Sequence, residues 1–298
     1  MLLHGRDCRL TIQAAGRELD IPYSEETIRE AVYVLAEEAS IEGEGHRKAI
    51  RKSAGVTGCI ITPLTIGTSP LLWALALGEA EPPLFVSETR NLYKHTLRLV
   101  PQDDSPSFTL IRERGAERIR FEHCRVSGFE LRINRETAGA LPGTVFLRLD
   151  ISGDMPPEPY LLETDSGLNH AERFKEPGVR YALNGVEIKT IYGLTVTAEK
   201  RGGTKTEVWI KRLNLSQPPS VAAEFPTTIE SLTVTARLFR EYYEWRTPGT
   251  FRLTLTRLLL MTDETSVNTS GPVIGPLRYY CAGDMTAETF TGNEEILL

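Results

Sequence analysis

Residues 127–134 read Ser-Gly-Phe-Glu-Leu-Arg-Ile-Asn, and residues 144–151 read Thr-Val-Phe-Leu-Arg-Leu-Asp-Ile. Apolar and polar side chains alternate in both stretches, for example with Phe129, Leu131 and Ile133 on one side and polar residues between them. Successive side chains of a β-strand point to opposite faces, so this pattern predicts two strands with one face against a core. The fold class they indicate is mainly β.

The same alternation continues outward along the chain. It recurs at residues 107–113, 194–199, 232–238 and 250–256. Glycine- and proline-containing segments that suit turns separate these stretches, at residues 114–116, 141–143 and 201–203. We therefore expect an antiparallel β-sandwich or barrel.

One short helix is expected at residues 69–77. Ser69 can cap it, Pro70 suits the first helical position, and Gly78 can close its end. Its side chains are apolar on nearly every side, which predicts packing against a sheet. Residues 24–36 are a weaker helical candidate, in which residues 31–35 fit a strand equally well, and we interpret residues 55–58 as a turn.

A weak internal repeat indicates two tandem, related β-domains. Residues 142–149 read PGTVFLRL and residues 248–255 read PGTFRLTL, and each follows a predicted strand. The proline-rich segment 153–159 is the expected boundary, because proline cannot donate to a ladder. This divides the chain into domains 1–155 and 156–298, although one chance match in a β-rich chain would give the same pattern.

Composition and motifs favour a structural role over catalysis. The 298 residues are 41% hydrophobic with a net charge of −6, which is ordinary for a globular protein and disfavours tight DNA binding. No apolar stretch approaches the roughly 20 residues of a membrane span. The five histidines and four cysteines show no metal-ligand spacing, and no phosphate-binding loop is present. Neighbours on a strand diverge, so Glu122, His123 and Cys124 cannot share one metal. We predict no catalytic residue, cofactor or metal.

Opposite charges gather in two neighbouring blocks between residues 25 and 52. An acidic block is followed directly by a basic one. Such blocks suit either a solvated hairpin or complementary patches that meet between subunits. The candidate inter-subunit contacts are Glu37, Glu38, Glu42, Glu44, Arg47, Lys48, Arg51 and Lys52.

The first 155 residues resemble the tail tube proteins of long-tailed bacteriophages (siphophages). The motifs that carry this resemblance, in order, are Gly58–Leu64, a helix ending in Leu77-Gly78, His95-Thr96-Leu97, Pro106–Leu110, Phe121–Leu131 and the strand at 144–151. His123 stands where that family usually has glycine, and the later half is only loosely similar.

The resemblance implies a β-sandwich or barrel of the tail tube type with a short packed helix. It also implies subunits joined edge to edge in rings, with the rings stacked into a tube that passes DNA. Two tandem domains would make each ring a trimer, and single domains would make it a hexamer. The expected partners are further copies, other tail proteins and DNA in transit, without a membrane span. The expected location is the host cytoplasm during assembly and then the virion tail.

Three alternatives remain open at this point. A tube initiator, terminator or baseplate component would share the fold but form isolated rings instead of tubes. A β-barrel module that binds a sugar or lipid would be a monomer with a ligand cavity. An enzyme would show activity in a metal assay or a hydrolase panel.

Overall fold

The computed structural model describes residues 8–14, 16–38, 47–78, 81–87, 92–134, 144–154, 158–159, 173–174, 178–189, 191–200, 206–217, 226–236, 250–263 and 273–291. Within these ranges the chain forms nineteen strands and one helix. In chain order they are β1 (Cys8–Ala14), β2 (Arg17–Asp20), β3 (Glu25–Glu26), β4 (Arg29–Glu38), β5 (Arg47–Pro63), α1 (Ser69–Leu77), β6 (Leu84–Ser87), β7 (Leu92–Arg98), β8 (Phe108–Arg114), β9 (Glu117–Asn134), β10 (Val145–Gly153), β11 (Glu158–Pro159), β12 (Val179–Leu183), β13 (Val186–Ile188), β14 (Ile191–Lys200), β15 (Thr206–Gln217), β16 (Thr228–Ala236), β17 (Phe251–Asp263), β18 (Val273–Cys281) and β19 (Met285–Thr291).

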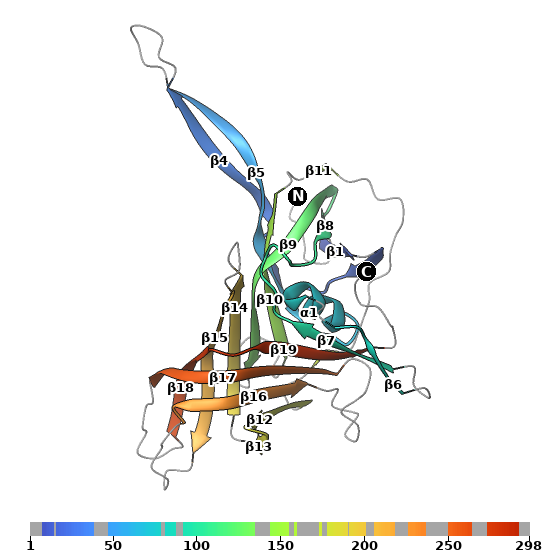
Figure 1. Ribbon diagram of the computed structural model, residues 1–298. Helices are drawn as coiled ribbons and strands as arrows, with labels where there is room; N and C mark the ends of the chain where they lie inside the picture. Colours follow the sequence, from blue (N-terminus) through green and yellow to red (C-terminus); the bar gives the residue numbers. More distant parts are fainter. Residues whose placement is uncertain are drawn as a thin grey trace.

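The strands form two layers that cross at a steep angle (Figure 1). One layer has the order β5, β10, β9, β14, β15, and the other has the order β6, β7, β19, β17, β16, β12, β13. β18 joins them, because it pairs with β15 on one side and with β17 on the other. Every strand pairing described is antiparallel, as the alternating sequence pattern led us to expect.

The two hairpins expected from the repeat both form. β10 pairs with β9 with Val145 opposite Ile133, and β17 pairs with β16 with Phe251 opposite Ala236. The proline-glycine segments that precede β10 and β17 lie outside the described residues. Inward positions alternate strictly along β10, where every second residue is buried. The period-two pattern therefore reports the core face correctly.

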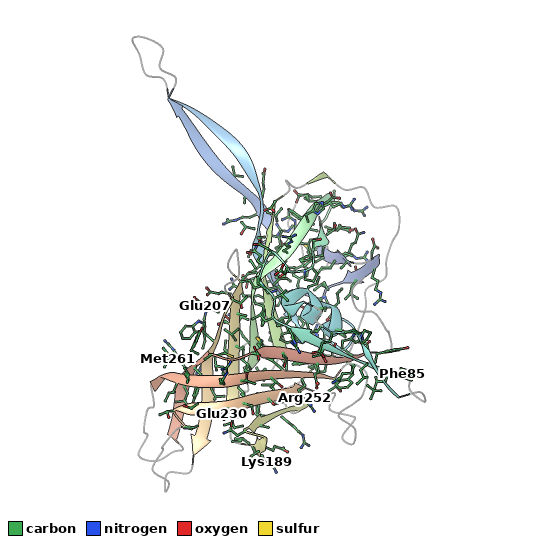
Figure 2. All side chains as sticks on the ribbon, in the orientation of Figure 1. Phe85, Lys189, Glu207, Glu230, Arg252 and Met261 are labelled. Atoms are coloured by element: carbon green, nitrogen blue, oxygen red, sulfur yellow. The ribbon has the colours of Figure 1, made fainter. Side chains whose placement is uncertain are left out.

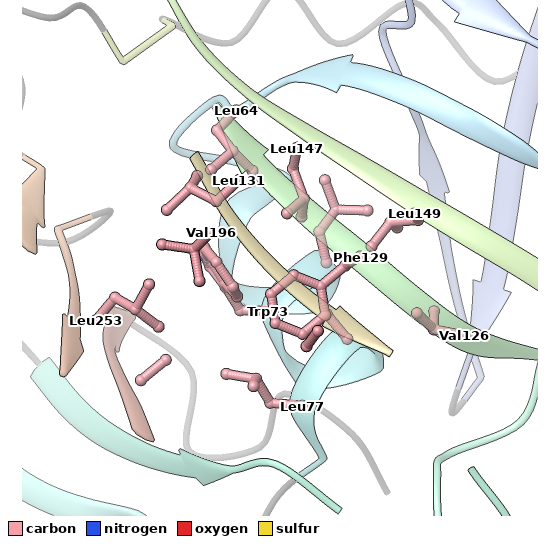
Figure 3. Packing of buried hydrophobic residues seen from close by; sticks show 14 of the residues in the cluster. Leu64, Trp73, Leu77, Val126, Phe129, Leu131, Leu147, Leu149, Val196 and Leu253 are labelled. Carbon is pink, nitrogen blue, oxygen red and sulfur yellow. The ribbon is translucent and has the colours of Figure 1, made fainter. Parts of the chain in front are cut away.

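Helix α1 has the bounds expected from the sequence and fills the space between the layers. It contacts β9, β7 and β19. Trp73 lies at its centre, and its ring centroid is 5.7 Å from that of Phe129 of β9 (Figure 3). It is 5.5 Å from the ring centroid of Phe251 of β17. The expected cap is wrong: Thr68 is the N-cap residue and makes no side-chain capping bond. Burial of the helix, rather than capping, holds this terminus in place.

One hydrophobic core and one hydrogen-bonded network contain residues from both halves of the chain. Gly128–Asn134 of β9 pair with Gly193–Glu199 of β14, and β19 pairs with β7. Near the expected boundary the ladder resumes, since Pro159 pairs with Ile119. The division at residue 155 stays a prediction, and it coincides with no break in the sheet or core among the described residues.

Two local interpretations are settled by the structure. Residues 24–36 contain no helix: residues 25–26 form β3, and residues 29–36 belong to β4. The turn expected at residues 55–58 is wrong, because Gly55 and Gly58 lie inside the 17-residue strand β5. Both glycines have positive φ, 107° and 152°. Each also passes close to the backbone of a neighbouring segment.

Candidate subunit interface

Strands β4 and β5 form a long hairpin that extends away from the rest of the molecule (Figure 1). Arg29 lies opposite Thr57 near the base and Glu38 lies opposite Arg47 at the outer end. The ten residues of β4 reach roughly 33 Å at about 3.3 Å per residue. Only residues 56–63 of β5 also pair with β10. Toward the tip, β4 and β5 pair only with each other among the described residues.

The base of the hairpin is fixed by backbone contacts that require glycine. A Cβ atom on Gly58 would lie 2.6 Å from the carbonyl oxygen of Thr27, and one on Gly55 would meet Gly153. Thr27 also accepts a 3.0 Å hydrogen bond from the backbone N–H of Cys59 through its hydroxyl. These contacts set the direction in which the hairpin leaves the body.

A buried ion network lies beside this base. The side chain of Glu26 is 2% exposed, ion-pairs with Arg114, and lies 3.8 Å from the Arg112 guanidinium. Arg112 donates a 2.5 Å hydrogen bond to the Ile28 carbonyl and lies over the ring of Phe121. A carboxylate buried among two guanidinium groups ties β3 to β8 and holds the root of the hairpin rigid.

The structure places most of the predicted contact residues on this hairpin. Glu37 lies opposite Lys48, and Glu38 lies opposite Arg47, so the acidic and basic blocks face each other within one chain. Arg51 and Lys52 lie opposite Val34 and Tyr33 instead. Glu42 and Glu44 lie outside the described residues. That these residues contact another subunit stays a prediction.

Two further open borders were not found by sequence reasoning. β6 and β13 end the second layer, and each has one strand neighbour in the described part of the chain. Leu84 and Phe85 of β6 are 58% and 44% exposed, and Val186 of β13 is 66% exposed. Exposed apolar residues on an open edge mark a site for strand pairing. The signal was present in the apolar run after Pro83 and in the Asn184-Gly185 turn between β12 and β13.

The number of strands fixes how these two edges can meet. Seven strands run from β6 to β13, each antiparallel to the next, so the two edge strands point the same way. A head-to-tail contact between β6 of one copy and β13 of the next would therefore be parallel.

Comparison with known proteins adds nothing to this geometry. No protein-family model matches the chain, and no curated protein shows detectable similarity to it. Among the described residues, no helix combines the length and the apolar character required to cross a membrane.

The reactive side chains described do not form a catalytic constellation. Burial raises the pKa of the Cys124 thiol to about 12 and also raises the pKa of Cys281, so both thiols favour the unreactive protonated form. His123 is exposed on the bulged part of β9 while Cys124 is fully buried. No three His, Cys, Asp or Glu side chains of the described ranges are grouped to hold a metal.

A buried lysine–serine pair is the most unusual polar contact. Lys200, only 3% exposed, donates a 2.8 Å hydrogen bond to the hydroxyl of Ser105, and that hydroxyl donates to the Pro101 carbonyl at 3.0 Å. Burial lowers the pKa of Lys200 to about 7. Ser105 is equally buried, so a substrate has no access to either group, and the pair fastens the loop before β8 to the end of β14.

One cavity of about 320 Å³ lies where β18 turns into β19. Arg98, Thr206, Cys281 and Asp284 are among its lining residues. Arg98 already forms an ion pair with Glu81 at 2.5 Å, and the Cys281 thiol donates toward the carbonyl of Thr256. The volume is at the lower limit for a small-ligand site.

Proposed function

We propose that this protein is a structural subunit of a bacteriophage tail tube, which assembles with copies of itself into stacked rings around a lumen that passes DNA. The observation that carries the proposal is the hairpin β4–β5, whose outer part has no further strand partner within the described chain. An isolated two-stranded hairpin is marginally stable in water, so a partner surface explains why a long one is kept.

The open edges β6 and β13 supply a second basis for assembly. Unlike edges on one subunit make a head-to-tail contact, which closes into a ring when the rotation between copies permits. The parallel pairing required here is slightly weaker per residue than an antiparallel one, and both strands are short. We therefore expect the ring to depend on the hairpin as well as on the edges.

The phage-specific part of the proposal rests on the ordered motifs of the first 155 residues. Those motifs fall on described elements: Gly58–Leu64 on β5 and the residue after it, His95–Leu97 on β7, and Phe121–Leu131 on β9. A tube initiator, terminator or baseplate component would use the same surfaces and stop after one ring. We propose the virion tail as the location, reached after assembly in the host cytoplasm.

The test is the assembly state of the purified protein. Size exclusion with light scattering over a concentration series, followed by negative-stain electron microscopy, should show rings or tubes. A matched variant replaces residues 32–54 with Asn-Gly, which joins Ala31 to its register partner Gly55 by a two-residue turn. This variant should keep the melting temperature of the body and lose assembly.

A wild-type protein that stays monomeric at every concentration, together with a shortened variant of identical behaviour, would overturn the proposal. Isolated rings without tubes would assign the protein to the initiator or terminator role.

A further inference from the structure

A chain of hydrogen bonds connects Lys200, at the end of β14, to the root of the β4–β5 hairpin. The Lys200 amine donates to the Ser105 hydroxyl at 2.8 Å, and the backbone N–H of Ser105 donates to the Gln102 carbonyl at 3.1 Å. The side-chain amide of Gln102 donates in turn to the Ser152 hydroxyl of β10 at 2.7 Å. Residues 101–105, which we call the latch loop, therefore join the end of β14 to the end of β10.

The end of β10 is the place where the hairpin leaves the body. Ser152 lies opposite Thr57 of β5, and Thr57 lies opposite Arg29, the first residue of β4. Gly153, the next residue of β10, closes its pairing with β5, and the Gly153 carbonyl oxygen leaves no space for a side chain at Gly55. A movement of the latch loop would therefore act on the residues that set the direction of the hairpin.

The amine at the other end of this chain of contacts is buried beside neutral groups. Lys200 is 3% exposed, and the partner of its amine within the described residues is the Ser105 hydroxyl, which donates onward to the Pro101 carbonyl at 3.0 Å. A neutral amine fits such a site, whereas an ammonium ion there loses its hydration without gaining a counter-charge. The closed latch loop therefore favours the uncharged form of Lys200.

The charged side chains near this contact do not face the amine. Within the described ranges they are Asp103, Asp104, Arg125, Glu199 and Glu207. The two aspartates are exposed, and the two glutamates lie opposite each other, one position from Lys200 and so on the other face of the β14–β15 pair. Arg125 lies opposite Ser152, on the outer face of β10. None of these charges compensates for the burial of the amine.

Proton uptake therefore favours an open latch loop. Burial lowers the pKa of Lys200 to about 7 in the closed form, whereas a lysine in water has a pKa of about 10.4. Between these values the open form binds a proton that the closed form lacks, so each unit by which the pH falls favours opening about tenfold. Below pH 7 both forms are protonated, and the opening equilibrium no longer depends on this group.

We propose that residues 101–105 form a proton-controlled latch on the β4–β5 hairpin, which protonation of Lys200 releases from β14 and which acts on the hairpin root through the contact between Gln102 and Ser152. The closed latch holds the end of β10 against β5 and keeps the hairpin in one direction. The open latch leaves that end free to move. The release takes place within one subunit and does not depend on assembly, so it goes beyond the proposed function.

Hydrogen–deuterium exchange between pH 7 and pH 9, corrected for the intrinsic exchange rate at each pH, tests the latch. Wild-type peptides covering residues 99–108 and 55–62 should lose protection by about tenfold for each unit by which the pH falls. Lys200→Met has no amine to protonate and should show no such slope in either peptide. The matched control is Lys189→Met, at an exposed lysine far from the hairpin (Figure 2), which should keep the wild-type slope.

Gln102→Ala separates the latch from its effect on the hairpin, because it removes the contact with Ser152 and keeps the Lys200–Ser105 bond. In this variant residues 99–108 should keep the slope, and residues 55–62 should lose it. An equal slope in both peptides would mean that the whole fold opens and would overturn the coupling. A wild-type loop without a slope, or a slope that persists in Lys200→Met, overturns the latch itself. Each result is independent of whether copies of the subunit assemble.

Discussion

Gly55 of β5 passes so close to Gly153 at the end of β10 that a Cβ atom on residue 55 would lie 1.9 Å from the Gly153 carbonyl oxygen. This contact marks the place where β5 stops pairing with β10 and continues with β4 alone. The position therefore demands glycine for space as well as for its positive φ of 107°.

Substitution of Gly55 by alanine should destabilise the fold at the root of the hairpin. Both the clash and the backbone strain act, so we expect a loss of about 3 kcal/mol or more in the free energy of unfolding. Urea denaturation followed by fluorescence would measure it. The control is Gly16→Ala, which shares a positive φ but has open space around the Cβ position and should lose only about 1 kcal/mol. Equal losses in the two variants would contradict the role of the Gly153 contact.

Truncation of Trp73 should cost about 3–5 kcal/mol, since the ring is fully buried between Phe129 and Phe251. Trp73→Phe should retain part of the packing and lose less than Trp73→Ala. Thermal melts of both variants would show the order. A Trp73→Ala protein as stable as the wild type would mean that the helix does not hold the layers together.

Glu26→Gln should destabilise the fold, because it leaves the guanidinium charges of Arg112 and Arg114 beside a neutral amide in a buried site. We expect a loss of about 3 kcal/mol. The comparison is Glu187→Gln, which breaks the exposed pair with Arg180 and should cost under about 1 kcal/mol. Similar small losses in both would show that the network at the hairpin root contributes little.

Stability should rise with pH above neutrality because of Lys200. Burial lowers its folded-state pKa to about 7, whereas the unfolded chain keeps the usual value of about 10.4. Between these values the unfolded state binds a proton that the folded state lacks, so the free energy of unfolding gains up to about 1.4 kcal/mol per pH unit. Below pH 7 both states are protonated, and this dependence stops. Lys200→Met should remove the slope; a wild-type curve parallel to that of Lys200→Met from pH 7 to 10 would refute the assignment.

Lysine on the open edge should block ring formation without unfolding the subunit. Leu84→Lys/Phe85→Lys places charge on β6, where an added strand would have to bury it. We expect a smaller assembled mass in light scattering and an unchanged melting temperature. Thr96→Lys, on the outer face of the paired strand β7, is a control that leaves the edge intact. Full assembly of the β6 variant would exclude this edge from the ring.

The sequence predicts those strands and helices that local residue patterns determine. Alternation located β8, β10 and residues 127–134 of β9, and the bounds of α1 were predicted correctly from Pro70 and Gly78. The pattern failed at Gly55 and Gly58, because their conformation is set by Gly153 and by Thr27, contacts that no local window contains. The exposed edges were missed for a similar reason: whether β6 or β13 has a second neighbour depends on the order of strands in the layer.

The charged residues show the same limit. Their two blocks were evident from composition, but the register that sets Glu37 against Lys48 is a property of the folded hairpin. The register shift that sets Lys211 and Arg212 of β15 opposite Arg278 of β18 has no sequence signature, since the two strands lie far apart in the chain.

The seven-strand layer has a consequence for symmetry. A β6 edge and a β13 edge can join while both copies keep the same orientation. Two β6 edges, or two β13 edges, can continue a sheet only antiparallel, and one of the two molecules is then inverted about a two-fold axis. An inverted pair presents the same end of the subunit in both directions and cannot carry a directional column. An insertion that added or deleted one strand of this layer would turn the parallel head-to-tail contact into an antiparallel one, so whether that number is odd sets the hydrogen-bond pattern between upright copies.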